Sequence, residues 1–202
     1  MNSHFAILFD AFGTLCEILT KRNPYKPILK AWPSGVANAY QTLMTRDVLP
    51  ESLACEVGCS TEAILQMEES IQAEIDSMQL YPEVPAVLEA IKRRGLKWAI
   101  VSNLATPYAE PLLKLLPFAP DACAWSFAVG YRKPEAGIYE YACKVLGVSP
   151  ASVLMVGDSL ENDYNTPRRI GMQAMFLKRS GTNENMADCV NDLAGILPLL
   201  DG

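Results

Sequence analysis

Polar side chains stand directly after three short apolar runs of the chain. Asp10 follows FAILF, Ser102 and Asn103 follow WAIV, and Asp158 and Ser159 follow VLMVG. Runs of this kind are typical of buried strands, and in an open parallel sheet ligands bind beyond the carboxyl ends of the strands. If the three strands are neighbours, we expect carboxylate, hydroxyl and amide groups to meet at one edge of the sheet.

Two further charged residues belong to this set. Lys133 comes shortly after an apolar run that we expect to be a strand ending near residues 127–130, and Asp163 follows Asp158 in the next helical segment. Taken singly, each residue has an ordinary structural reading, such as a helix cap, a turn or a solvated lysine. The argument for a site therefore rests on their occurring together.

Charge repulsion restricts how the three carboxylates can be arranged. Two unit charges 4 Å apart interact by about 4 kcal/mol at an effective dielectric of 20, so Asp10, Asp158 and Asp163 can cluster only around a cation. Oxygen ligands without His or Cys favour a hard ion such as Mg²⁺, which is often held by one or two carboxylates and a substrate phosphate. With Lys133 and Mg²⁺ the site is formally neutral, which leaves room for a phosphate dianion or an organic acid.

Composition excludes several other kinds of chemistry. The single histidine, His4, lies close to the N-terminus, so His-dependent relays and His-ligated zinc are not expected. The net charge of −6 and the absence of a long basic block argue against nucleic acid as a partner. No apolar run reaches the ~18 residues of a membrane span, and FAILF has no Lys or Arg before it, so we expect a soluble cytoplasmic protein.

The six cysteines do not have the pattern of a disulfide framework, and we expect them to be reduced. Cys55 and Cys59 have helical spacing, but no second pair and no nearby histidine completes a zinc site. We interpret these two as buried thiols.

The order of the predicted elements indicates an α/β fold. Five apolar runs predict strands, and helical patterns over 82–94 and 134–146 end at Gly95 and Gly147, as helices often do. Alternating strands and helices predict a Rossmann-like parallel sheet with helices on both faces. The strands are expected at 5–9, 97–101, 124–129, 153–156 and 174–177.

One long segment breaks this alternation. Residues 17–79 contain no convincing strand, and an apolar stripe from Ile64 to Met78 has the period of a helix. We therefore expect an α-helical cap subdomain at 17–79, inserted into a core formed by 1–16 and 80–202. Prolines leave the helix starts after Asn103 and Asp163 less regular, because Pro107 and Pro111 cannot both be the first residue of one helix.

Four motifs in order, FDAFGTL, VSN, YRKPEAGIY and VGDSLEND, resemble those of the haloacid dehalogenase superfamily, and the helical insertion lies where that family places its cap. The resemblance covers nearly the whole chain except the cap. It implies that Asp10 is a nucleophile that forms an aspartyl intermediate. It also implies that Ser102 and Asn103 bind the transferring group together with Lys133, which stabilises its negative charge.

The same resemblance implies a Mg²⁺ site. Asp10, Asp158 and the backbone carbonyl of Phe12 would be its protein ligands, and Asp163 would orient the site from the outside. The implied activity is Mg²⁺-dependent hydrolysis of a small phosphorylated metabolite by a monomer or homodimer.

Phe12 departs from the phosphatase pattern, which has a second Asp at this position. That Asp protonates the leaving group, and a positioned acid is worth roughly 10² to 10⁴ in rate. Phosphate esters should therefore react slowly, whereas the rate with acyl phosphates, which have better leaving groups, should be reduced less. The 2-haloacid dehalogenases of the superfamily typically carry Tyr there, so carbon–halogen hydrolysis is an alternative. A weakly active protein that binds a phosphorylated ligand is a third hypothesis.

Overall fold

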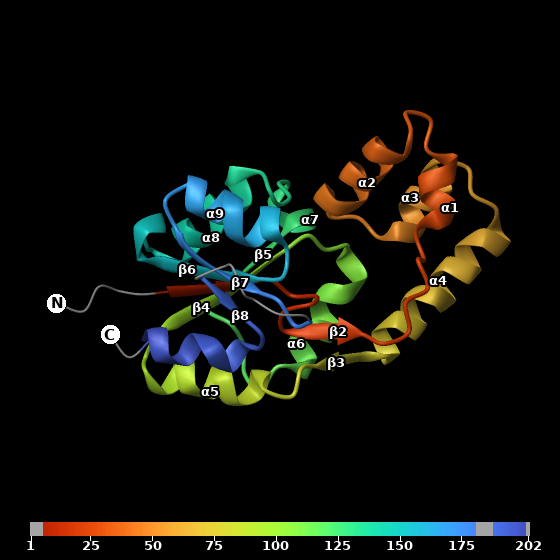
Figure 1. The fold of residues 1–202 in the computed structure, drawn as a ribbon. Coiled ribbons are helices and arrows are strands. Elements are labelled where there is room, and N and C mark those ends of the chain that lie inside the picture. Colours follow the sequence, from red (N-terminus) through yellow and green to blue (C-terminus); the bar gives the residue numbers. More distant parts are fainter. Residues whose placement is uncertain (1–5, 181–187, 201–202) are drawn as a thin grey trace.

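The main sheet of the computed structural model, which describes residues 6–180 and 188–200, contains six strands (Figure 1). All five neighbouring pairs are parallel, in the order β5-β4-β1-β6-β7-β8. The predicted fold class is therefore confirmed. His4, and Phe5 at the start of the first predicted strand, lie outside the described residues. The strands are β1 (Ala6–Phe9), β4 (Lys97–Ser102), β5 (Ala122–Trp125), β6 (Val153–Gly157), β7 (Gln173–Leu177) and β8 (Cys189–Val190).

The sheet is buried because helices cover both of its faces. In Figure 1, α5 and η4 lie on one side of it and α8 and α9 on the other. Alternate residues of β1 belong to the two resulting cores: Ile7 and Phe9 pack in one, Ala6 and Leu8 in the other. The covering elements are α5 (Val84–Arg93), η1 (Thr106–Tyr108), α6 (Ala109–Leu115), α7 (Ser126–Val129), α8 (Ala136–Leu146), η2 (Pro150–Ser152), η3 (Leu160–Asn165), α9 (Thr166–Arg169) and η4 (Leu193–Leu200).

The predicted helix ends are confirmed more closely than the predicted helix starts. α8 ends at Gly147, which has a left-handed backbone with φ of 69°, and Gly95 follows α5 with φ of 66°. Both helices begin two residues after the predicted start. The prolines after Asn103 act as expected, because Pro107 lies in the short η1 turn and Pro111 lies in the first turn of α6.

The strand predicted at 124–129 is wrong in its second half. β5 ends at Trp125, and residues Ser126–Val129 form α7, which ends at Gly130 with φ of 83°. The buried hydroxyl of Ser126 accepts a hydrogen bond of 2.9 Å from the Leu104 backbone, which ties the chain to the segment after β4. Lys133 therefore follows a helical turn rather than the end of a strand.

The segment between β1 and α5 is mostly helical, as predicted, and its helices lie to one side of the sheet (Figure 1). The apolar stripe forms α4 up to Ile75, whereas its last predicted member, Met78, begins β3 (Met78–Leu80). The first turn of α4 is capped by the Ser60 hydroxyl, and Met67 and Ile71 are buried. Its helices are α1 (Lys26–Ala31), α2 (Val36–Thr45), α3 (Pro50–Glu56) and α4 (Thr61–Asp76).

Two short strands correct the expectation that residues 17–79 contain none. β2 (Cys16–Ile18) and β3 (Met78–Leu80) pair in an antiparallel manner where the chain enters and leaves the helical segment. Three-residue strands are too short to show a period of two, and these pair across 62 positions of sequence, as Glu17 with Gln79. The boundaries predicted at 16/17 and 79/80 therefore fall inside a pair of strands.

The six cysteines are free, but the interpretation of Cys55 and Cys59 as buried thiols is wrong. Cys55 is exposed because α3 turns Leu53 and Ala54 toward the core instead, and Cys59, which follows α3, is partly exposed. Within the described residues, no helix has the length and apolar character needed to cross a bilayer.

Candidate functional site

Lys133 lies at the centre of the candidate site. Its ammonium is 2.6 Å from a carboxylate oxygen of Asp10 and 2.6 Å from one of Asp163, and its side chain is only 3% exposed. Burial lowers the pKa of Lys133, but the two carboxylates outweigh burial and hold the pKa above its ordinary value. The lysine is therefore a fixed positive charge between two acids that lie far apart in the sequence.

Asn103 holds the backbone of this lysine in place. The Asn103 side chain accepts a hydrogen bond of 2.6 Å from the Lys133 N–H and donates one of 2.8 Å to the Lys133 carbonyl. Both polar ends of the amide are thus used within the protein. The structure assigns Asn103 a positioning contact, whereas the sequence predicted contact with the substrate.

Asp163 is held from two sides. One carboxylate oxygen accepts from Lys133 and the other accepts a hydrogen bond of 3.0 Å from the Ser159 N–H. Gly157 makes room for this carboxylate, because a Cβ at that position would lie 2.4 Å from the Asp163 carboxyl carbon. Asp163, which is 1% exposed, is therefore rigidly placed beneath the site.

Asp10, Asp158 and Asp163 come together, as the sequence predicted. One carboxylate oxygen from each lies within 4.8 Å of the others. The pKa of Asp10 is raised to about 7, because burial and the charge of Asp163 together outweigh the lowering by Lys133. Desolvation and the charge of Asp163 also raise the pKa of Asp158. Burial is the main cause of both shifts, and the neighbouring carboxylate of Asp163 adds to each of them.

The loop after Asp10 approaches Asp158 closely. Gly13 has φ of 87°, and a Cβ there would lie 2.1 Å from an Asp158 oxygen, so this position requires glycine. Phe12, one residue earlier, packs against Tyr108 in a T-shaped arrangement, with ring centroids 5.9 Å apart. Ser102 is buried at the end of β4, the strand that pairs with β1 on the side opposite β6.

Arg179 is a residue of this site that the sequence analysis missed. Its guanidinium donates hydrogen bonds of 3.0 and 2.7 Å to the carbonyls of Gly13 and Thr14, and it pairs with Glu83 at 2.7 Å. It also lies 3.4 Å from the centre of the Tyr81 ring. Arg179 comes two residues after the end of β7, so the rule that site residues follow the strands of a parallel sheet also points to it.

A second missed group joins the helical segment to the core. The buried Glu74 of α4 accepts a hydrogen bond from the Tyr108 hydroxyl and two more, of 2.6 and 3.1 Å, from the N–H groups of Arg22 and Asn23. A pocket of about 250 Å³ lies beside these residues, with Phe12 and Asn103 also in its wall. Glu74 lies on the same buried face of α4 as Met67 and Ile71, so a carboxylate within the apolar stripe was the sequence signal that could have found it.

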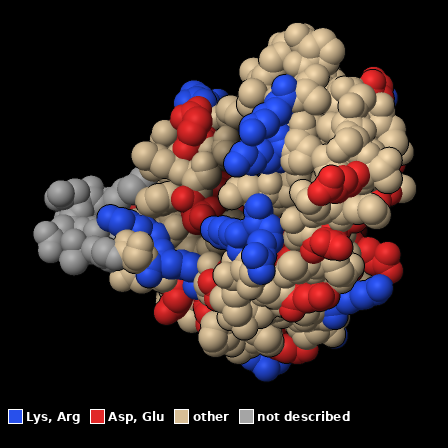
Figure 2. Space-filling view, turned by 90° about the vertical axis from the view of Figure 1, so that its right-hand side faces the viewer, with Lys and Arg blue, Asp and Glu red and all other residues tan. Residues whose placement is uncertain are grey.

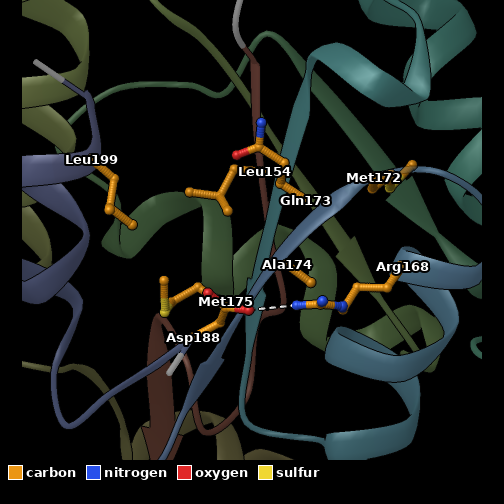
Figure 3. A pocket seen from close by; sticks show the side chains of 8 residues that line it. All are labelled: Leu154, Arg168, Met172, Gln173, Ala174, Met175, Asp188 and Leu199. Carbon is orange, nitrogen blue, oxygen red and sulfur yellow. Dashed lines mark hydrogen bonds and ion pairs between the residues drawn. The ribbon is translucent and has the colours of Figure 1, made fainter. Parts of the chain in front are cut away.

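Another pocket, of about 420 Å³, lies at the opposite end of the sheet (Figure 3). It is lined by the first residues of β7, and its two charged side chains, Arg168 and Asp188, point toward one another and pair at 2.5 Å. None of the acids described above lines it. The carboxyl end of the sheet is therefore the better candidate for catalysis.

Comparison with known proteins identifies the family of this chain. A family model described as haloacid dehalogenase-like hydrolase matches residues 6–171. The N-acetylmuramic acid 6-phosphate phosphatase of Pseudomonas aeruginosa is 33% identical over 100 residues, which are 48% of this chain and 44% of that protein. The chain spans about half the length of the curated relatives it matches.

Solved structures of similar fold include both phosphatases and dehalogenases. A HAD phosphatase from Thermococcus onnurineus is 27% identical with a TM-score of 0.69, and the match covers 98% of each chain. The L-2-haloacid dehalogenase of Xanthobacter autotrophicus, 20% identical with a TM-score of 0.66 and 98% of each chain covered, shares the fold. The family match spans most of the sequence, including all the acids of the site. The chain belongs to the haloacid dehalogenase-like hydrolases.

Proposed function

We propose that this hydrolase is a Mg²⁺-dependent phosphohydrolase that acts on small phosphorylated molecules through Asp10. The observation that carries the proposal is the contact of the buried Lys133 with both Asp10 and Asp163, next to Asp158. An acid held against a fixed cation, at the open edge of a parallel sheet, is suited to attack a group that carries negative charge.

In the proposed reaction an Asp10 oxygen attacks phosphorus. The bond from phosphorus to the leaving oxygen breaks, and an aspartyl phosphate forms. Water then attacks that phosphorus, which releases inorganic phosphate and returns the Asp10 carboxylate. Lys133 faces the charge that develops on the phosphoryl oxygens, and Asp163 keeps the ammonium in position.

The donor set fits a magnesium ion. Asp10 and Asp158 offer carboxylate oxygens, and neither histidine nor cysteine contributes to the cluster. Because Asp10, Asp158 and Asp163 bring three negative charges together beside Lys133, a further cation would relieve their repulsion. Asp10, Asp158 and the Phe12 carbonyl would hold the ion, and Asp163 would remain bound to Lys133. When bound, Mg²⁺ would neutralise phosphate charge and orient the phosphoryl group.

Charge on the surface supports an anionic substrate. Figure 2 shows Lys and Arg side chains gathered across the middle of one face, beside acidic side chains. Although the whole chain carries a net charge of −6, such a local group of cations can attract an anion.

We also propose that residues 17–79 act as a cap over the site. Two hydrogen bonds join this segment to the residues after β4: the Thr106 hydroxyl donates one of 2.9 Å to the Val48 carbonyl, and the Tyr108 hydroxyl donates one to Glu74. Both contacts lie close to Asn103. A cap held there would shield the phosphoryl group from bulk water.

Phe12 determines which substrates should react well. Its ring cannot donate a proton, so leaving groups that depart without one, as in acyl phosphates, are favoured over alkyl esters. Some relatives are named phosphoserine phosphatase or phosphoglycolate phosphatase, and both named substrates are alkyl esters. These esters belong in the panel as slow substrates.

The test is phosphate release from acetyl phosphate and a panel of phosphate esters, with and without Mg²⁺. We expect Mg²⁺-dependent release that the substitution Asp10→Asn abolishes and that the exposed control Asp47→Asn leaves unchanged. Release by Asp10→Asn equal to that of the unmodified chain would remove Asp10 as the nucleophile.

Phe12 also favours a second candidate, a 2-haloacid dehalogenase. In that reaction Asp10 would attack the carbon and displace halide, with no proton needed by the leaving group. Halide release from a 2-haloacid without Mg²⁺ would support it. Stabilisation by phosphate without turnover of either substrate class would indicate a binding protein instead.

A further inference from the structure

The pocket beside Asn103 has the right place to receive the part of a substrate that departs. Phe12 and Asn103 form part of its wall. Phe12 is two residues from Asp10, and Asn103 is hydrogen-bonded to the backbone of Lys133, which contacts Asp10. A phosphoryl group at Asp10 would therefore lie near two residues of the wall of this pocket.

The wall of the pocket is largely aromatic and aliphatic. Tyr108 forms T-shaped contacts with Phe12 and with Tyr25, with ring centroids 5.9 and 6.4 Å away. Ile18 of β2 and Met44 of α2 close the pocket from the helical segment. Its volume of about 250 Å³ exceeds the ~150 Å³ of a cavity that accepts benzene.

Charge in the pocket has one sign. Among the described residues no Lys or Arg side chain lines it, whereas Glu74 does. The Glu74 oxygens already accept hydrogen bonds from Tyr108 and from two backbone N–H groups, and none of these donors is a cation. A second anionic group on the substrate would thus enter an apolar space that holds a carboxylate and no counter-ion.

We infer that this pocket selects phosphate monoesters and acyl phosphates whose leaving group is uncharged and apolar, a single ring or a short chain, over those that carry a carboxylate. The inference rests on the proposed phosphohydrolase function and adds a substrate class to it.

A pair of aryl phosphates that differ only in charge tests this selection. 4-Carbamoylphenyl phosphate and 4-carboxyphenyl phosphate have nearly the same shape, and one carries the extra negative charge. We expect kcat/KM for the carbamoyl ester to be at least roughly tenfold higher, because a like charge in an apolar site is costly.

A substitution in the wall separates pocket charge from the intrinsic reactivity of the two esters. Ile18→Lys places a cation in the wall, and Ile18→Met is the matched uncharged control. We expect Ile18→Lys to lower the carbamoyl-to-carboxy ratio of kcat/KM by roughly tenfold, and Ile18→Met to leave it unchanged. Because the ratio is compared between variants, differences in leaving-group reactivity cancel.

The outcomes distinguish this inference from the function on which it rests. Preference for the carboxy ester, or release from acetyl phosphate with neither aryl ester hydrolysed, would overturn the inference and leave the phosphohydrolase standing. With no release from any phosphate, the proposed function fails. The inference is then tested by binding. The Tm of the Asp10→Asn variant is measured with each aryl ester, and equal shifts in Tm would overturn the inference.

Discussion

The ammonium of Lys133 lies 2.6 Å from the Asp10 carboxylate, and 123 positions of sequence separate the two residues. The same ammonium contacts Asp163 at 2.6 Å, so one lysine joins the ends of three segments of the chain. All three side chains are at most 10% exposed. The candidate site is therefore also part of what holds the carboxyl edge of the sheet together.

Replacing this lysine should destabilise the protein strongly. Lys133→Met leaves two buried carboxylates without their cation, and breaking a buried pair in this way costs about 3–5 kcal/mol. Denaturant unfolding measures the loss. The control is Lys114→Met, which removes an exposed pair with Glu110 and should leave the free energy of unfolding nearly unchanged.

A second substitution tests whether unpaired charge causes this loss of stability. Adding Asp163→Asn to Lys133→Met removes one of the two unpaired carboxylates, so the double variant should recover part of the lost stability. No recovery would mean that packing of the lysine stem, rather than its charge, accounts for the loss.

The acids of the site were predictable because one rule places them. Asp10 and Asp158 each follow a buried strand of a parallel sheet, and the edge where such strands end is fixed by topology. The contact of Tyr108 with Glu74 was not predictable, because it depends on how a helical segment docks on a loop. The pair β2–β3 was missed because its strands have three residues each and pair across 62 positions of sequence.

Phe12→Asp should increase the rate with substrates that need a proton on the leaving group. A positioned acid contributes roughly 10² to 10⁴ in rate, and we expect at least tenfold in kcat for an alkyl phosphate. Phe12→Asn, which has the size of Asp but no acid, is the control. Acetyl phosphate should show little gain. Equal rates for the Asp and Asn variants would show that proton supply does not limit turnover.

Arg179→Lys should weaken Mg²⁺ binding. Arginine bonds the carbonyls of Gly13 and Thr14 and pairs with Glu83, a set of contacts that one ammonium cannot reproduce. The loop it holds lies against Asp158, and groups that orient metal ligands typically contribute roughly tenfold or more in affinity. Calorimetric titration with Mg²⁺ measures the change, with the exposed Arg168→Lys as control. Unchanged affinity would limit Arg179 to a structural contact.

Glu83 should make stability depend on pH through its pairing with Arg179. Burial raises the pKa of Glu83, but hydrogen bonds from backbone N–H groups and from Arg179 outweigh burial and leave the pKa below its ordinary value of 4.5. A lowered pKa means that the stabilisation is present above pH 4.5 and is lost as the pH falls through the folded-state value.

Glu83→Gln cannot titrate, so it should be less stable than the unmodified chain by about 1 kcal/mol at pH 7. This difference should shrink as the pH falls below 4.5, because the unmodified chain then loses the same charge. Urea unfolding at several pH values between 7 and 3.5 measures it, and Glu89→Gln, on the exposed side of α5, controls for the loss of one negative charge. A difference that stays constant over this range would mean that the Glu83 carboxylate does not stabilise the fold through its charge.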